Sequence, residues 1–216
     1  RSQESAADQA AVKYLENIEK SSNGMLEVLY KFANQEALSS RQQSVRVRSH
    51  PLSRDRIRAL EQKVQKSQFI NENDTDDLIF KYKMIQAKLE GFLNNPNDII
   101  KKNAKNPSLI YNKYSSSVAY YRKALMDKSI TMINEMIEEY PKNPWFYELK
   151  GQILYESGKI KDSILPYEKA LSLSPLEPLL MVALATALNA LENQNDAIKA
   201  RNLLKNSLKY DKKNTQ

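Results

Sequence analysis

Apolar residues recur at the three- and four-residue spacing of amphipathic helices along most of the chain. Four such stretches lie in the first half, at about 5–20, 25–38, 54–67 and 76–93. In the first stretch, the apolar stripe is made of Ala7, Ala11, Tyr14, Leu15 and Ile18. The pattern predicts an all-α protein whose first helix buries this stripe.

The composition supports a helical fold and removes several kinds of chemistry. The 216 residues include only 4 Gly and 8 Pro, whereas sandwiches, barrels and Rossmann sheets need many tight turns. The sequence has no Cys, which excludes a cysteine nucleophile, thiolate metal sites and disulfides. It also has no apolar run of about 18 residues, so no segment is expected to span a membrane.

The last hundred residues carry an internal repeat. Pro141 and Pro175 lie 34 positions apart, and the residues before them correspond. One unit has Tyr147, Gly151, Leu154, Ser163, Tyr167 and Ala170, and the preceding unit has Ser117, Tyr120, Ser129, Ile133 and Met136. A weaker third unit begins near Leu179. The pattern resembles the tetratricopeptide repeat, in which small residues let paired helices approach closely. Plain helical hairpins remain the alternative.

A tetratricopeptide array presents a concave surface built from the first helix of each pair. The aromatic residues expected there are Tyr111, Tyr114, Tyr121, Trp145 and Tyr155. Rigid aromatic side chains on such a surface are typical of sites that bind protein or peptide partners. The alternative is that several of them pack against the first hundred residues.

The net charge of +7 is concentrated in one segment. Between positions 41 and 58 there are six arginines and one Asp, the arginines being Arg41, Arg46, Arg48, Arg54, Arg56 and Arg58. Such a cluster attracts phosphates, but no base-reading motif accompanies it. We therefore expect no nucleic-acid partner, and a basic nucleic-acid binder is the weaker alternative.

The candidate catalytic residues are few. His50 is the only histidine, so the sequence cannot contain a His-Glu-x-x-His zinc motif. Glu4 and Asp8 are four residues apart and share one helical face, as a metal-binding carboxylate and a supporting acid would. An acid in a first turn also simply favours the helix dipole. His50 precedes Pro51, and Arg56 follows six positions after His50; both residues are also compatible with a solvated surface.

Taken together, these two motifs resemble the end of the catalytic domain in the zinc metallopeptidase family of CaaX prenyl proteases and HtpX-like proteases. The resemblance implies that Glu4 is the third zinc ligand, that Asp8 is a neighbouring acid, and that His50 and Arg56 complete the site. In that family an upstream His-Glu-x-x-His helix supplies two zinc ligands and the general base. Because this helix is missing here, we expect no zinc binding and no cleavage by this chain alone.

The resemblance also implies a domain organisation. We expect the end of a metallopeptidase domain at 1–70, connecting helices at 71–108, and a tetratricopeptide-like α-solenoid at 109–216. The chain starts with Arg1 rather than Met, so we expect a processed or truncated product.

The function implied is that of a zinc metalloendopeptidase in envelope protein quality control, located in the periplasm or envelope of a Gram-negative bacterium. Its repeats would bind protein or peptide clients, including membrane-proximal envelope proteins. The alternative is a non-catalytic tetratricopeptide scaffold, in which Glu4 and His50 have no catalytic role.

Overall fold

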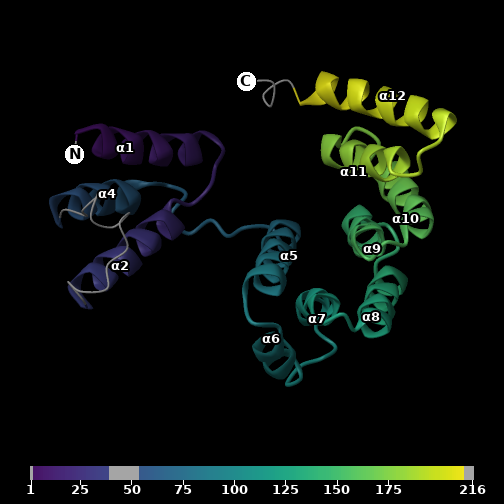
Figure 1. Cartoon of the computed structure of the whole chain (residues 1–216). Helices are drawn as coiled ribbons and strands as arrows, with labels where there is room; N and C mark the ends of the chain where they lie inside the picture. Colours follow the sequence, from purple (N-terminus) through teal and green to yellow (C-terminus); the bar gives the residue numbers. More distant parts are fainter. Residues whose placement is uncertain (1, 39–53, 212–216) are drawn as a thin grey trace. The chain divides into compact units, whose positions relative to one another are not determined.

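The computed structural model describes residues 2–38 and 54–211, and this part of the chain is helical with no strand (Figure 1). The prediction of an all-α fold is therefore confirmed. The chain divides into two compact units, Arg1–Ile79 and Phe80–Gln216. Within the described ranges, no helix combines the length and the apolarity that are needed to cross a bilayer.

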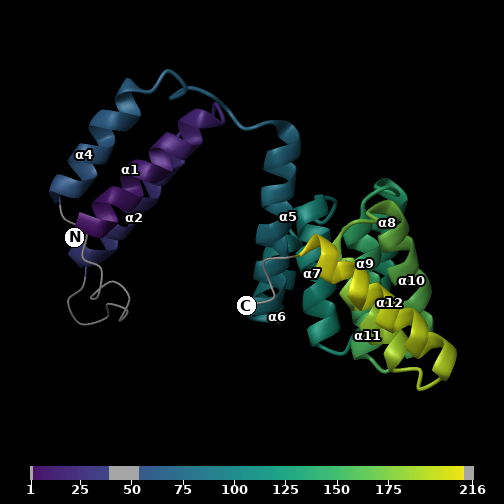
Figure 2. The same ribbon diagram turned by 90° about the horizontal axis from the view of Figure 1, so that it is seen from above.

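The first unit contains α1 (Ser2–Asn17), α2 (Asn23–Leu38) and α4 (Arg54–Lys66), and α4 contacts both of the others (Figure 2). The observed bounds of α2 and α4 are close to the predicted ranges. The core of this unit is made by Val12, Leu26, Leu29, Ile57, Leu60 and Val64. One apolar stripe from each helix therefore closes a small three-helix core.

The predicted apolar stripe of α1 is only partly buried, since Ala11 and Leu15 are half-buried and Ala7 is exposed. Tyr14 and Ile18 are 68% and 64% exposed, and Ile18 lies beyond the end of the helix. Asp8 and Val12 are buried instead. The buried face is displaced from the apolar stripe because Arg56 of α4 holds the Asp8 carboxylate, which allows an acid to lie inside.

The second unit begins within α5 (Asp76–Leu93), and its three consecutive helical hairpins follow α5 and α6 (Pro96–Asn103). The hairpins are α7 (Ile110–Arg122) with α8 (Met126–Glu139), α9 (Pro144–Glu156) with α10 (Ile160–Leu173), and α11 (Pro178–Asn189) with α12 (Gln194–Tyr210). The first helices of successive hairpins begin 34 positions apart, which is the interval between Pro141 and Pro175. The second helices of successive hairpins begin at the same spacing. The sequence period is thus a structural period.

The turn inside each hairpin has the same backbone conformation. Ala124, Gly158 and Glu192 all have positive φ, at 57°, 79° and 56°, and they too are separated by one repeat period. A left-handed residue at this position ends the first helix and reverses the chain.

Small residues lie where the paired helices cross, as the repeat pattern predicts. The buried Ser129 hydroxyl donates to the Ser117 carbonyl oxygen at 2.8 Å, between α7 and α8. In the next hairpin, a Cβ on Gly151 would lie 2.7 Å from the Tyr167 ring. Larger residues at these positions would separate the two helices.

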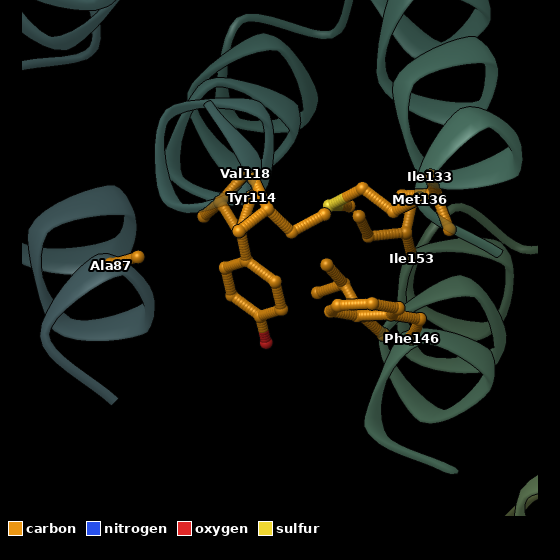
Figure 3. Packing of buried hydrophobic residues seen from close by; sticks show 9 residues of the cluster. Ala87, Tyr114, Val118, Ile133, Met136, Phe146 and Ile153 are labelled. Atoms are coloured by element: carbon orange, nitrogen blue, oxygen red, sulfur yellow. The ribbon is translucent and has the colours of Figure 1, made fainter. Parts of the chain in front are cut away.

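The main core of the second unit joins α5, α7, α8 and α9 (Figure 3). Tyr114 lies between Ala87 of α5 and Phe146 of α9, and the rings of Tyr114 and Phe146 are 6.2 Å apart. Helix α5 therefore contributes to the same core as the first two hairpins.

Candidate functional site

Two carboxylates lie one turn apart near the start of α1. Glu4 belongs to the first turn, where the helix dipole favours a negative charge. Asp8 follows four residues later on the same face and is only 7% exposed. Removing a carboxylate from water in this way requires a partner for its charge.

Arg56, the third residue of α4, supplies that partner. Its Nη2 donates to Asp8 Oδ1 at 3.0 Å, and its Nε donates to Asp8 Oδ2. Its Nη1 lies 3.5 Å from Glu4 Oε2. The two-pronged bond to Asp8 matches the planar guanidinium and links α4 to α1.

The electrostatics of the site keep the guanidinium charged. The hydrogen bond from Arg56 to Asp8 raises the pKa of Arg56 most strongly, and the charges of Asp8 and Glu4 raise it further. Partial burial acts in the opposite direction. The net effect is a permanent cation between two acids.

Three of the four residues predicted for this site, Glu4, Asp8 and Arg56, come together, although Asp8 and Arg56 are 48 positions apart in the chain. The predicted neighbour His50 lies outside the described residues. Its approach to Glu4 therefore stays a prediction.

The described residues do not by themselves fit a zinc ion. Among residues 2–38 and 54–211, no three His, Cys, Asp or Glu side chains are grouped so that they could hold a metal. A catalytic zinc takes three protein ligands, and here two carboxylates share an arginine. We therefore derive no zinc chemistry from this chain alone.

An acid pair one turn apart, joined to a later arginine, is the arrangement that the resemblance to zinc metallopeptidases implies. Residues 1–64 match the model of peptidase family M48. The match includes α1, α2 and nearly all of α4, and with them Glu4, Asp8, His50 and Arg56. This segment is thus similar to M48 peptidases, which are typically zinc-dependent. None of the curated proteins matches the chain.

The second candidate site is the surface predicted to bind partners. We call it the hairpin face and define it by positions that recur once per repeat on the first helices of the hairpins. These positions are Tyr111, Tyr114, Val118 and Tyr121 on α7, Trp145, Glu148, Gln152 and Tyr155 on α9, and Leu179, Val182, Thr186 and Asn189 on α11.

On α7, helix α5 covers the hairpin face. Tyr114 is only 2% exposed, so the prediction that it contacts partners is wrong. The Tyr111 ring lies 5.9 Å from that of Phe80, with Lys83 Nζ 5.4 Å from the Tyr111 ring centre. The alternative, packing against the first hundred residues, therefore holds for both tyrosines.

On α9, the predicted aromatic residues differ in accessibility. Trp145 is 38% exposed, whereas Tyr155 is half-buried against the cluster around Tyr167. The Tyr121 hydroxyl reaches over from α7 and donates to Glu156 Oε2 at 2.5 Å. Burial, followed by this hydrogen bond, raises the pKa of Tyr121 to about 12. Of the five aromatic residues, Trp145 is the most available to a partner.

Sequence reasoning missed the acids of this face. Glu148 Oε2 lies 3.4 Å from Lys88 Nζ of α5. Burial raises the pKa of Glu148, the nearby Lys88 lowers it, and the charge of Glu156 raises it. The sequence signal that could have identified Glu148 is its spacing, because it follows Trp145 by three residues and so lies on the same side of α9.

Proposed function

We propose that this chain is part of a zinc-dependent metalloendopeptidase of the M48 type, with tetratricopeptide repeats that bind other proteins. The observation that carries the proposal is the family match over 1–64, combined with the contacts of Glu4 and Asp8 with Arg56. These are the residues that the resemblance assigns to the end of the catalytic site.

In the longer protein, Glu4 would act as the third zinc ligand, with two histidines supplied by a His-Glu-x-x-His helix. When bound, zinc supplies a polarised, activated water for peptide hydrolysis. Asp8 would hold Arg56 in place from one side. Arg56 and His50 would then either stabilise the negative charge that develops on the peptide oxygen or close the open metal position.

The hairpins would recruit protein clients. Their support is the structural period of the three hairpins and the exposed side chains of Trp145, Leu179 and Val182 on the hairpin face. From the family resemblance, the clients would be misassembled proteins of a Gram-negative envelope, and the protein would work in the periplasm.

A non-catalytic scaffold is the second candidate, and one observation favours it. The sequence holds a single histidine and therefore no His-Glu-x-x-His motif. The coding sequence directly upstream of Arg1 distinguishes the two candidates, because a His-Glu-x-x-His helix there is required by the first and absent from the second.

The experiment compares cleavage of a fluorogenic peptide by the 216-residue chain and by a protein extended upstream to include that helix. We expect cleavage from the extended protein only, and we expect Glu4→Gln to lower its kcat/KM by about a hundredfold or more, because a zinc ligand is lost. Glu27→Gln, at an exposed acid of α2, is the matched control and should change nothing. Full activity of the Glu4→Gln variant would refute the assignment of Glu4 as a zinc ligand. An inactive extended protein would refute the proposal that the longer protein is a peptidase.

A further inference from the structure

Helix α5 packs on the hairpin face of α7, with contacts near both ends. Phe80 meets Tyr111 near the start of both helices. Near their ends, a Cβ on Gly91 would lie 2.8 Å from Val118 Cβ. The two helices therefore run in the same direction, and α5 occupies on α7 the positions that the repeat places on the partner-binding side.

The equivalent positions are only partly open on α9, where Glu148, Gln152 and Tyr155 are half-buried, and are exposed on α11. Trp145 corresponds to Tyr111, and Leu179 and Val182 follow on α11 with exposed fractions of 64% and 41%. Helices α9 and α11 contact each other, so these side chains lie on adjacent helices. We call the surface made by Trp145, Gln152, Leu179 and Val182, together with the neighbouring Glu156 of α9, the open hairpin face.

The open hairpin face joins an apolar strip on α11 to one exposed carboxylate on α9, that of Glu156. Helix α11 has no charged residue between Pro178 and Asn189. On α9, Glu156 is held by two neutral donors, the Tyr121 hydroxyl at 2.5 Å and Gln152 Nε2 at 2.8 Å. Its negative charge is therefore solvated by hydrogen bonds but is not neutralised by them.

The way in which α5 is held indicates which ligand suits this surface. α5 turns Phe80, Met84 and Ala87 toward the core, at the spacing of one helical face. The next residue, Lys88, meets the carboxylate of Glu148 at the edge of that face. An amphipathic helix with a lysine beside its apolar stripe is thus already bound next to the open surface.

We propose that the open hairpin face binds an amphipathic, basic helix of a partner protein, in the manner of α5. Apolar side chains of the partner pack on Leu179 and Val182, and a Lys or Arg pairs with Glu156. The proposal rests on the partner-binding role of the hairpins and names the class of partner.

The test uses a fluorescein-labelled peptide with the sequence of α5, in which the outward apolar residues Leu78, Tyr82, Ile85, Leu89 and Leu93 are replaced by Gln. A second peptide also replaces its Lys88 by Glu. Fluorescence anisotropy with the whole chain should show binding of the first peptide and at least about tenfold weaker binding of the second, because one charge pair is reversed.

Variants of the chain locate the site. Val182→Glu should abolish binding of the first peptide, and Glu156→Gln should weaken it about tenfold. Glu156→Gln should also reduce the preference for the Lys peptide over the Glu peptide. Glu138→Gln, at an exposed acid on the second helix of the first hairpin, is the matched control and should bind as the wild type does. The far-ultraviolet circular dichroism spectrum confirms that each variant is folded.

Two outcomes overturn the proposal in different ways. If neither peptide binds but unfolded β-casein binds, and Val182→Glu abolishes that binding, the hairpins bind partners and the class named here is wrong. If neither peptide nor casein binds, the partner-binding role fails as well. Binding of the first peptide that is unchanged in Val182→Glu places it elsewhere and also overturns the proposal.

Discussion

The guanidinium of Arg56 neutralises a buried acid, so its removal has a structural cost. Asp8 is 7% exposed, and Arg56→Ala removes both of its hydrogen bonds to Arg56. We expect the free energy of unfolding of the first unit to fall by about 2 kcal/mol, because a mostly buried charge is left without that partner. Hydrogen exchange of the α4 amides measures the change.

Lys63→Ala is the matched control, because Lys63 is a cation of the same helix whose bond to Gln9 at 3.2 Å is exposed to solvent. We expect its effect on α4 exchange to stay below about 0.5 kcal/mol. Equal protection in the two variants would show that the bond between Arg56 and Asp8 contributes nothing to the fold.

Glu148 should make the second unit sensitive to pH. Its folded-state pKa is raised, chiefly by burial, above its ordinary value of 4.5. The folded state therefore holds the proton more tightly, and this contribution to stability is complete below pH of about 4 and is lost as pH rises through the folded pKa. Glu148→Gln should remove that loss. Melting temperatures measured from acidic to neutral pH test this, and an identical pH slope in the variant would contradict it.

At the scale of elements, the three hairpin turns form a natural comparison. Each turn requires a residue with positive φ, but only Gly158 is a glycine. We expect Ala124→Gly and Glu192→Gly each to stabilise the second unit by about 1 kcal/mol, because glycine adopts this conformation without steric strain. Gly158→Ala should destabilise it by a similar amount, and thermal denaturation measures all three.

The essential result is that the two substitutions to glycine stabilise the second unit whereas Gly158→Ala destabilises it. The side chains at positions 124 and 192 are exposed, and a Cβ at Gly158 would meet no atom, so backbone strain rather than packing decides the outcome. If glycine were neutral or destabilising at both positions 124 and 192, the shared turn conformation would be wrong.

The ranges of the helices could be predicted well from the sequence, but the neighbours against which each helix packs could be predicted less well. The range of α5 was predicted correctly, because an unbroken apolar period runs from the acidic first turn at Asp76 to Leu93. Its packing was not predictable, because α5 has two apolar stripes. Phe80 and Met84 face the core, while Tyr82 and Ile85 are exposed. Periodicity alone cannot choose between two such stripes.

The candidate site, too, could be predicted only in part from the sequence. Glu4, Asp8 and Arg56 were found by motif spacing, because the resemblance assigns them to one site. Asp8 is buried by contacts with α4, and Tyr114 is buried by contacts with α5. Both helices are distant in sequence from the residue that they cover. A local sequence pattern does not specify such tertiary contacts between distant helices.

At the scale of the molecule, we propose that the hairpins bind partner proteins, separately from the segment that is similar to M48 peptidases. Trp145 tests this role. We expect Trp145→Ala to weaken binding of the α5-derived peptide about tenfold, because an exposed aromatic anchor is lost, with a change in melting temperature below about 3 °C. Anisotropy and thermal denaturation together check this. A large fall in melting temperature would instead identify Trp145 as a core residue.

The zinc content of the upstream-extended protein tests the central claim most directly. Elemental analysis after dialysis should give about one zinc per chain for the wild type and near zero for Glu4→Ala, because the third ligand is lost. The chain that begins at Arg1 should carry none. Equal zinc in the wild type and Glu4→Ala would contradict the assignment of Glu4 to the metal site.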